Sequence, residues 1–188
     1  MRKKTKHIIS VWFFPTKLGW MAIAGHKKKV NWLSFGYETR KESTEIWNVS
    51  KYNTDLVVSS RCHNWNPELA EQLTAYASGV PVCFESVKTD SDVDGESFSG
   101  QVLQRCQEIP YGHCLTYQQL AEKVKRPRAA RAVGNVMSRN RVPIIIPCHR
   151  VIAAHGGLGG FSMPKGVEMK RKLLGIESAS IKHTQYIR

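Results

Sequence analysis

The chemically most suggestive part of the chain joins a cysteine to a histidine, Cys148 and His149, directly after Pro147. The thiolate form of cysteine is the nucleophile, so a reactive cysteine needs a base or a cation close to it. His149 is the candidate base, but neighbouring residues in an extended chain point to opposite sides. A bridging water or a sharp turn is therefore required. The alternative is a buried structural cysteine beside a core histidine.

Two flanking segments would position this pair. Residues 144–146 are apolar, and we expect a buried extended piece that delivers the cysteine to a turn. Residues 153–164 are rich in glycine, so their backbone amides could approach a flat ligand closely, although a plain linker would look similar. A helix over residues 167–174 is expected to end at Gly175, with Glu177 just beyond it.

Upstream of the cysteine, apolar spacing predicts helices that could bind a partner. One covers residues 98–107, and a second covers 117–125 with Thr116 as its N-cap. A third is expected to run from Pro127 to about Arg139, and the last two helices make a helix-turn-helix candidate.

The last of these helices has a polar stripe and an apolar stripe at helical spacing. The polar stripe contains Arg128, Arg131, Asn135 and Arg139. The side suited to the core contains Ala129, Ala130, Val133, Val136 and Met137. The small residues Ala132 and Gly134 would let the helix approach a nucleic-acid backbone closely.

Positive charge is concentrated around these elements. The 188 residues carry a formal net charge of +13, and residues 123–150 hold eight Lys or Arg residues with no Asp or Glu. Cations laid on phosphates release condensed counterions, so this charge favours a nucleic-acid partner. The alternative is a solvated helix face, but a stretch of one sign repels itself unless something binds it.

The first half of the chain is predicted to be rich in β-structure. Strands are expected over residues 8–14, 20–24 and 30–35, and a helix over 67–77. The polar, acidic stretch 89–99 is typical of a linker. We therefore expect an α+β fold, with a small N-terminal sheet-and-helix domain and a mainly helical C-terminal domain that contains the helix-turn-helix. The expected boundaries are 1–90 for the first domain, 91–97 for the linker, 98–178 for the second domain and 179–188 for a basic tail.

Several classes of protein are disfavoured by the composition. No apolar run approaches the roughly 18 residues of a membrane span, and the short run after the basic N-terminus does not resemble a secretory signal. The five cysteines have irregular spacing and are expected to be free thiols, so we expect an intracellular protein of the cytoplasm or the nucleus. No metal and no cofactor are expected, although Cys62 and His63 could join distant residues in a zinc site.

Four groups of residues carry a family resemblance: Pro147 to Val151, Arg131 to Met137 with Asn140, Ile109 to Gly112, and Thr116 to Ala121. Together they resemble the O6-alkylguanine-DNA alkyltransferases. The resemblance is dense over residues 98–177 and loose in the first half, where residues 18–22 and 33–36 carry it.

The resemblance implies DNA repair by direct reversal. A methyl or other alkyl group would pass from O6 of guanine, and also from O4 of thymine, to Cys148 in one irreversible turnover. The implied partner is double-stranded DNA that contains O6-alkylguanine. The protein would act as a monomer, with cooperative binding along DNA left open.

Matching positions receive roles from the same resemblance. Cys148 would accept the alkyl group, His149 would act as its base through a water, and Glu177 would orient His149. Tyr117 would rotate the nucleotide out of the duplex and donate a proton to the leaving base. Arg131 would fill the gap that the extruded guanine leaves.

Other implied roles concern the pocket and the DNA surface. Asn140 would shape the turn that holds the cysteine, and the backbone amide of Ser162 would meet O6 of guanine. The carbonyls of Cys148 and Val151 would accept from the exocyclic amine of the base. The pocket would be completed by Met137, Pro143, Gly159 and Phe161. The second helix would lie in the minor groove, with DNA contacts from Arg128, Ala129, Ala130, Ala132, Gly134 and Asn135 beside Arg131 and Tyr117.

Three places depart from the usual family pattern. Arg141 stands where proline often follows the asparagine, Phe161 stands where tyrosine is common, and residues 163–165 replace small residues. The more crowded loop should admit a methyl group and hinder a bulky group such as benzyl.

Three further functions fit parts of the sequence. A non-catalytic damage-recognition protein of the alkyltransferase-like kind would lack the acceptor cysteine, which is present here. A cysteine hydrolase built on Cys148, His149 and Glu177 would turn over repeatedly, but an oxyanion motif is missing. A helix-turn-helix transcription factor would read an operator, but the second helix has few base-reading side chains besides Arg and Asn.

Overall fold

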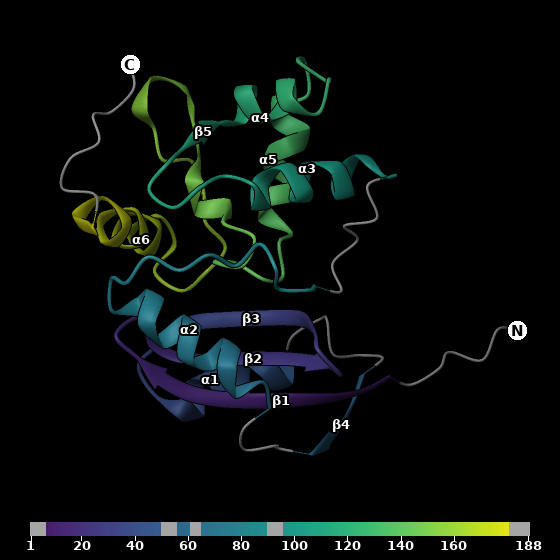
Figure 1. The fold of residues 1–188 in the computed structure, drawn as a ribbon, viewed down its shortest axis with the longest axis vertical. Coiled ribbons are helices and arrows are strands. Elements are labelled where there is room, and N and C mark those ends of the chain that lie inside the picture. Colours follow the sequence, from purple (N-terminus) through teal and green to yellow (C-terminus); the bar gives the residue numbers. More distant parts are fainter. Residues whose placement is uncertain (1–6, 50–55, 61–64, 90–95, 181–188) are drawn as a thin grey trace, which may run out of the picture.

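The N-terminal half of the protein is built on a four-stranded sheet. In the computed structural model, which describes residues 7–49, 56–60, 65–89 and 96–180, the strand order is β3-β2-β1-β4 (Figure 1). The strands are β1 His7–Thr16, β2 Gly19–His26, β3 Lys29–Tyr37 and β4 Leu56–Ser60. The first three are antiparallel neighbours, and β4 pairs parallel to β1. The three predicted strands are confirmed, whereas β4 was not predicted.

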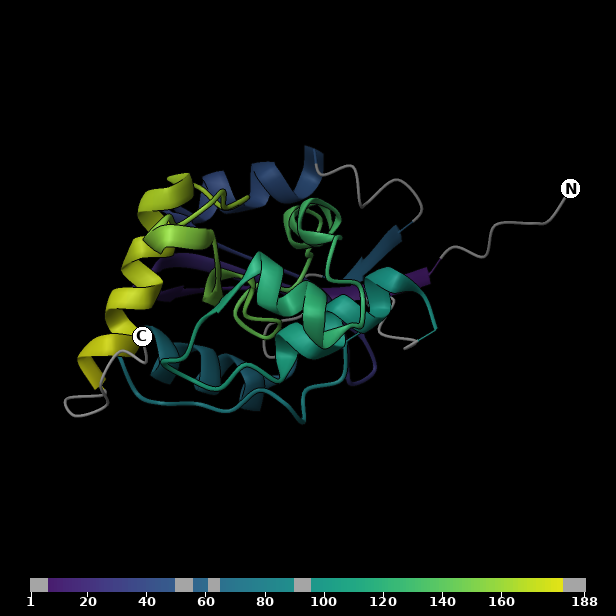
Figure 2. The same cartoon turned by 90° about the horizontal axis from the view of Figure 1, so that it is seen from above.

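Two helices cover opposite faces of this sheet (Figures 1 and 2). On one face α1, Arg40–Val49, places Trp47 edge-on against Trp32 at 4.8 Å between ring centroids. On the other face α2, Pro67–Ala77, buries Leu69 and Leu73. The bounds of α2 match the prediction, because Asn66 caps the helix and Pro67 occupies its first turn.

The C-terminal half is mainly helical, as predicted. Its helices are α3 Phe98–Gln107, α4 Tyr117–Lys123, α5 Ala130–Ser138 and α6 Gly166–Ser180. The two-residue strands β5 Leu115–Thr116 and β6 Val151–Ile152 pair in parallel, and short 3-10 turns cover Cys148–Arg150 (η2) and Ala154–Gly156 (η3). The small β5–β6 pair ties the start of α4 to the segment that carries the candidate nucleophile.

Two boundaries of the helix-turn-helix pair differ from the prediction. Helix α4 ends at Lys123, because Lys125 adopts a left-handed backbone conformation with φ of 57°. Helix α5 begins at Ala130, so Pro127 and Arg128 lie in the turn before it and not in its first turn. The two helices pack against each other with this turn between them, in the predicted helix-turn-helix.

The last helix is longer than predicted. Helix α6 continues through Gly175 to Ser180, so Glu177 lies on the helix and not beyond it. Glycine inside a helix costs only about 1 kcal/mol, and the burial of Leu173 together with the bonds of Glu177 to His149 and Arg150 outweighs that cost. The first two residues of the predicted tail therefore belong to α6, and residues 181–188 lie outside the described part of the chain.

The two halves share one hydrophobic core and join at the edge of the sheet. Core residues from α2 and from one sheet face form a single cluster with residues from α3, α4, α5 and α6. At the outer edge of β3, the amide of Leu33 donates to the carbonyl of Arg141 in the C-terminal half at 2.8 Å, and the amide of Val30 donates to the carbonyl of Lys88 in the N-terminal half at 2.9 Å. The α+β class is confirmed. The predicted domain boundaries stay a prediction, since most of the linker (residues 90–95) is not described.

None of the helices in the described ranges is both long enough and apolar enough to cross a membrane.

Candidate functional site

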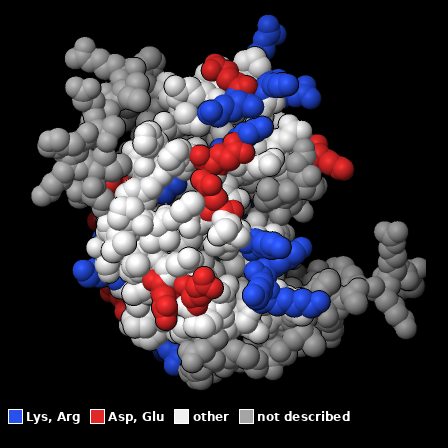
Figure 3. Space-filling model, viewed as in Figure 1, with Lys and Arg blue, Asp and Glu red and all other residues white. Residues whose placement is uncertain are grey.

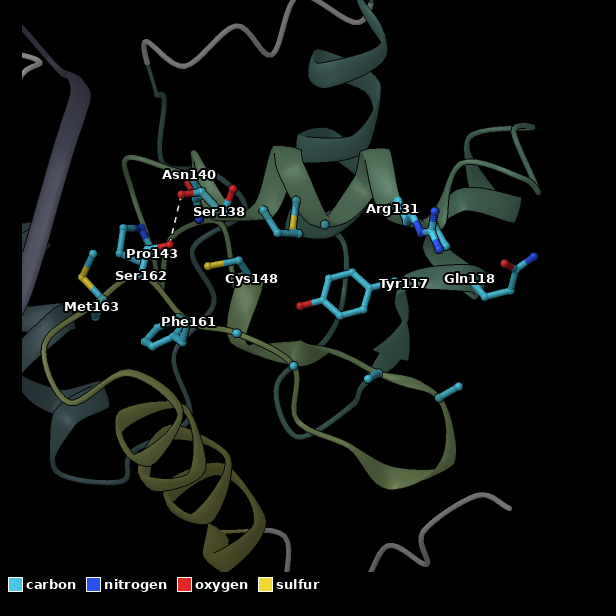
Figure 4. Close-up of a pocket in the computed structure, with 17 residues that line it drawn as sticks. Tyr117, Gln118, Arg131, Ser138, Asn140, Pro143, Cys148, Phe161, Ser162 and Met163 are labelled. Atoms are coloured by element: carbon cyan, nitrogen blue, oxygen red, sulfur yellow. Dashed lines mark hydrogen bonds between the residues drawn. The ribbon is translucent and has the colours of Figure 1, made fainter.

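A cavity of about 780 Å³ lies between α4, α5 and the loop that precedes α6 (Figure 4). Cys148 forms part of its wall and Tyr117 part of its rim, and Phe161 closes the side toward α6. In Figure 4 the hydroxyl of Tyr117 is on the side of its ring that faces Cys148, and Phe161 lies on the other side of Cys148 from Tyr117. Arg131 and Gln118 lie at the outer end of the cavity, where α5 and α4 begin. The cavity therefore connects the predicted nucleophile to the predicted DNA-binding helices.

The segment before the cysteine is a tight turn and not the extended piece predicted for residues 144–146. The amide of Ile146 donates to the carbonyl of Val142 at 2.9 Å, and Ile144 has a left-handed φ of 72°. A β-branched residue in this region is strained by roughly 1–3 kcal/mol. The three isoleucines are nevertheless buried as expected, because the turn packs into the core.

Asn140 holds this turn closed from inside. Its side-chain amide donates to the carbonyl of Ile146 at 2.8 Å, and its oxygen accepts from the amide of Val142 at 3.1 Å. Both contacts are buried. After the turn the amide of Cys148 donates to the carbonyl of Ile146 at 2.8 Å, and the chain enters η2, where the amide of Arg150 donates to the carbonyl of Pro147 at 2.8 Å. The turn and η2 together fix the direction in which the cysteine points.

The sulfur of Cys148 is nearly buried, with 7% of the residue exposed. Burial raises the pKa of its thiol, against the opposing effects of a hydrogen bond from Asn140 and the charge of Lys170. The resting form is therefore the thiol. A base must take its proton before the sulfur can act as a nucleophile.

His149 lies on the other side of the chain, in a fully buried polar cluster. Its Nε2 atom is 2.8 Å from Oε1 of Glu177, which comes from α6. The guanidinium of Arg150 donates to the same carboxylate at 3.0 to 3.2 Å, and the amide of Gly112 donates to Oε2 at 3.0 Å. The structure thus brings together His149 and Glu177 as expected.

The groups of this cluster differ in their protonation states. Burial would raise the pKa of Glu177, but hydrogen bonds and opposite charge from His149 and Arg150 outweigh it and hold the pKa at about 2. Burial lowers the pKa of His149, and the attraction of Glu177 only partly opposes this. At neutral pH the cluster therefore contains an ionised glutamate, an arginine cation and a neutral imidazole.

The position of the imidazole hydrogen follows from these partners. An ionised carboxylate only accepts, so Nε2 of His149 carries the hydrogen and Nδ1 is left with its lone pair. Nδ1 is buried and has no hydrogen-bond partner among the described residues. A bare ring nitrogen of this kind is what a general base requires.

Sequence reasoning missed three members of this region. The hydroxyl of Tyr76, on α2, donates to Oε1 of Glu177 at 2.7 Å and lies 3.2 Å from Nε2 of His149. Arg150 was treated only as part of a motif and of the basic surface, whereas it is 5% exposed and bound to Glu177. Lys170 is also buried. Its ammonium donates to the carbonyl of Val151 at 2.6 Å and lies over the ring of Tyr117.

The residues predicted to contact DNA lie along one end of the molecule. Arg131 and Asn135 are exposed on α5, Ala132 and Gly134 are half-buried, and Arg128 and Ala129 lie just before the helix. Exposed Lys123, Lys125, Arg126 and Arg128 surround the α4–α5 turn. Figure 3 shows Lys and Arg side chains gathered at this helical end and again beside the end of the sheet.

Glycine at two places lets Tyr117 lie against its neighbours. A Cβ atom on Gly134 would be 3.9 Å from the tyrosine ring, which is an ordinary contact. A Cβ atom on Gly159 would be only 2.8 Å from the tyrosine hydroxyl, and Gly159 has a φ of 70°. The loop before α6 can therefore touch Tyr117 only with glycine at position 159.

Within the described ranges, no three His, Cys, Asp or Glu side chains are grouped so that they could hold a metal ion. The predicted alternative pair, Cys62 and His63, lies outside the described residues.

Comparison with known proteins supports the interpretation of this cavity as a functional site next to DNA-binding helices. Residues 97–179 match the family model of the 6-O-methylguanine DNA methyltransferase DNA-binding domain. The chain is 34% identical to the methylated-DNA–protein-cysteine methyltransferase of Methanosarcina mazei over 94% of this chain and 98% of that protein. The protein belongs to the methylated-DNA–protein-cysteine methyltransferase family. The constitutive enzyme of Bacillus subtilis is also 34% identical, over 89% of this chain and 94% of its own length.

Solved structures of related proteins have the same fold as this methyltransferase over almost its whole length. The crystal structure of Mycobacterium tuberculosis OGT in complex with DNA aligns with a TM-score of 0.70 at 28% identity, covering 91% of this chain and 94% of that one. The O6-methylguanine-DNA methyltransferase of Pyrococcus kodakaraensis aligns with a TM-score of 0.63 at 25% identity, covering 90% and 99%. The N-terminal sheet, for which the sequence carried only a loose resemblance, is therefore part of the shared fold.

Most of the pocket residues predicted for this methyltransferase surround one cavity. It is lined by Met137, Pro143, Gly159, Phe161 and Ser162, together with Cys148, Asn140, Tyr117, Arg131, Ala130 and Gly134. Val151 is not among its lining residues, and its carbonyl already accepts a hydrogen bond from Lys170. His149 and Glu177 are likewise behind the wall, so they can influence the cavity only through Cys148 or through a bridging molecule.

Proposed function

We propose that this protein repairs alkylated DNA by direct reversal, moving a methyl group from O6 of guanine to the sulfur of Cys148. The single observation that carries the proposal is the nearly buried cysteine in the cavity wall beside the helix-turn-helix, in a chain of this family. The sulfur–carbon bond forms as the oxygen–carbon bond breaks. The product is a thioether, which none of the residues around the cavity can cleave, so each molecule reacts once.

Proton transfer in this scheme begins with His149. Its bare Nδ1 takes the thiol proton through a bridging water, and the imidazolium that forms is stabilised by ionised Glu177. Because His149 and Glu177 lie behind the cavity wall, the base is shielded from DNA while it acts. This arrangement supports a role for Glu177 as the group that orients His149 and balances its charge.

The leaving guanine needs stabilisation, because it departs as an anion. Burial raises the pKa of Tyr117, so its hydroxyl stays protonated and can donate to the base. Tyr117 recovers its proton from solvent as His149 releases the one it took. The backbone amide of Ser162, at the opposite side of the cavity, is a second donor suited to O6 of the guanine.

The base must leave the stack before the sulfur can reach it, at a cost of a few kcal/mol. We infer that Arg131, exposed at the outer end of the cavity, occupies the vacated space in the duplex. The half-buried Ala132 and Gly134 on α5 suit a close approach in the minor groove. The substrate is thus double-stranded DNA with O6-alkylguanine, and the same geometry would serve O4-alkylthymine.

The decisive experiment measures mass. The intact protein is mixed in excess with a duplex that contains one O6-methylguanine, and the peptide that contains Cys148 is expected to gain the mass of one methyl group. Cys148→Ser should abolish the gain, whereas Cys114→Ser, which removes an exposed thiol, should leave it unchanged. Methyl that stays on the DNA in the presence of excess wild-type protein would refute the proposal.

The same experiment separates the other candidate functions. A damage-recognition protein would bind the lesion tightly and leave the methyl group in place. A cysteine hydrolase would act on an ester or an amide many times per molecule.

An intracellular location fits the cysteines of the described region, Cys83, Cys106, Cys114 and Cys148, all of which are free thiols.

A second experiment tests the role of Arg131. Arg131→Ala should slow transfer from duplex DNA by about tenfold or more, because a lost positioning contact of this kind is worth at least about 1.4 kcal/mol. Transfer from the free modified base, where that base is accepted, should change much less. Arg171→Ala, which removes an exposed cation from α6, is the matched control. Equal losses on both substrates would contradict the proposed role.

A further inference from the structure

Tyr76 reaches the buried polar cluster from the other half of the protein. It lies near the end of α2, which packs on the N-terminal sheet, and it is separated from His149 by 73 residues and from Glu177 by 101. The residue is fully buried. Its hydroxyl contacts both His149 and Glu177, and so joins an N-terminal element to this pair in the C-terminal half.

We propose that Tyr76 is a positioning residue for the transfer reaction, whose hydroxyl fixes the hydrogen of His149 on Nε2 and limits the basicity of the imidazole. The proposal rests on the roles of His149 and Glu177 described under the proposed function. Tyr76 touches neither the cavity nor the reacting sulfur, so its effect is transmitted through these two side chains.

The geometry around Nε2 supports the first part of the proposal. The hydroxyl of Tyr76 has one hydrogen, and it is used in the 2.7 Å bond to Oε1 of Glu177. Toward Nε2 of His149, 3.2 Å away, the same oxygen can only accept. Nε2 therefore faces two acceptors and must carry the hydrogen, which leaves the lone pair on Nδ1.

The sharing of the carboxylate supports the second part. Oε1 of Glu177 accepts from Tyr76, from His149 and from Arg150. Each donor draws on the same negative charge, so less of it is left to stabilise an imidazolium. Removing the Tyr76 hydroxyl would strengthen the attraction between Glu177 and protonated His149. It would also remove the weaker acceptor, 3.2 Å from Nε2, but the 2.8 Å contact with Glu177 dominates, so the imidazole would become protonated at higher pH.

Replacing Tyr76 by phenylalanine leaves the other charged and titratable groups around His149 and Glu177 unchanged. Those that face His149 are Arg150 beside it and Lys170 and Glu177 on α6, and Tyr111 also lies near Tyr76. The ring of Tyr76 packs edge-on against Phe84 and Tyr111 at 5.9 and 6.0 Å between centroids. Phenylalanine retains this packing, so Tyr76→Phe isolates the hydroxyl.

The test is the pH dependence of single-turnover methyl transfer by the whole protein. Tyr76→Phe should move the acid limb of the rate profile up by about one pH unit, so that rates on that limb fall roughly tenfold while the plateau changes little. Tyr37→Phe is the matched control, because Tyr37 is also a buried tyrosine of the N-terminal half but has no link to His149. Identical profiles for wild type, Tyr76→Phe and Tyr37→Phe would overturn the proposal.

Two further measurements distinguish the possible failures. If the proposed function is correct, Glu177→Gln should alter the pH profile of the transfer rate whether or not Tyr76 has a role. If it does not, the roles of His149 and Glu177 fail, and the inference fails with them. If it does while Tyr76→Phe has no effect, only the inference fails. In the wild-type protein, nitrogen NMR shifts of His149 should show hydrogen on Nε2 at neutral pH, and hydrogen on Nδ1 would refute the inference without any variant.

Discussion

Oε1 of Glu177 lies 2.8 Å from Nε2 of His149, at a place where neither side chain is more than 1% exposed. The carboxylate is held there by Arg150 as well, so an acid, a base and a cation share a site that is buried away from bulk solvent. Burial of charge is costly unless the charges are paired and hydrogen-bonded. This cluster therefore makes the stability of the protein depend on the same groups that we propose for catalysis.

Glu177→Gln should lower the free energy of unfolding by about 3 to 5 kcal/mol, because it leaves buried Arg150 without its counter-charge. Urea unfolding at neutral pH measures the loss. Glu108→Gln is the control, since Glu108 pairs with Arg105 at the surface, where both side chains are 48% exposed, and its loss should cost less than about 1 kcal/mol. Similar losses in the two variants would argue against a stabilising buried pair.

Acid should destabilise the protein over a defined range of pH. The pKa of Glu177 is about 2 in the folded protein against 4.5 for the free group, so the stabilisation is complete above pH 4.5 and is lost as pH falls toward 2. At about 1.4 kcal/mol per pH unit, the loss amounts to about 3 kcal/mol. His149 adds a loss of the same sign below pH 6.5, because burial lowers its pKa. Unfolding curves of wild type and Glu177→Gln should converge in acid, and parallel curves would contradict this linkage.

Gly159→Ala should slow methyl transfer by about tenfold or more. The added methyl group would lie 2.8 Å from the hydroxyl of Tyr117, and the backbone φ of 70° adds roughly 1 to 2 kcal/mol of strain. The tyrosine or the loop must then move out of position. Gly160→Ala provides the comparison, because its added methyl group meets no atom within 4 Å and should cost far less. Single-turnover rates on duplex DNA measure both, and equal rates would show that the contact is unimportant.

Asn140→Ala should affect both stability and sulfur reactivity. Two buried backbone groups, the carbonyl of Ile146 and the amide of Val142, would lose their partner, at a cost of about 2 kcal/mol. The pKa of Cys148 should rise further, because the hydrogen bond from Asn140 lowers it. Alkylation of the Cys148 peptide by iodoacetamide, without DNA, should therefore be slower.

A second substitution at the same position tests that explanation. Asn140→Asp keeps the acceptor for Val142 but removes the donor and adds a negative charge near the thiol. Its cysteine should react more slowly than that of Asn140→Ala. An alkylation rate equal to that of the wild type in either variant would rule out this role of Asn140.

Much of the fold could be predicted because the deciding signals are local. Asn66 and Pro67 mark the start of α2, Thr116 caps α4, and apolar spacing defines α3. Helix α1 lacked such signals, since its described apolar residues are Ile46, which is exposed, and Trp47. The turn before Cys148 was mistaken for an extended piece because three consecutive isoleucines favour strands, while Asn140 imposes the turn from outside that segment.

The site was predictable where residues adjacent in sequence do the work, and not where the fold brings distant ones together. The pattern around Cys148 and His149 identified the family, and it predicted Cys148 as the reactive residue. The burial of Arg150 depends on Glu177 arriving from α6, 27 residues later, and no local pattern distinguishes it from a surface arginine. Tyr76 lies on the buried face of α2, but nothing in the sequence connects that face to His149.

The main-chain bond from Leu33 to Arg141 also decides how the N-terminal half would behave alone. An uncovered strand edge is a template on which another chain can add itself. In the intact protein Arg141 of the second half covers the edge of β3 at Leu33, whereas Val30 is paired within the first half. A fragment that ends before the helices would expose it, and would self-associate into larger aggregates. The helical half thus prevents self-association of the sheet through this edge, a role separate from the chemistry of Cys148.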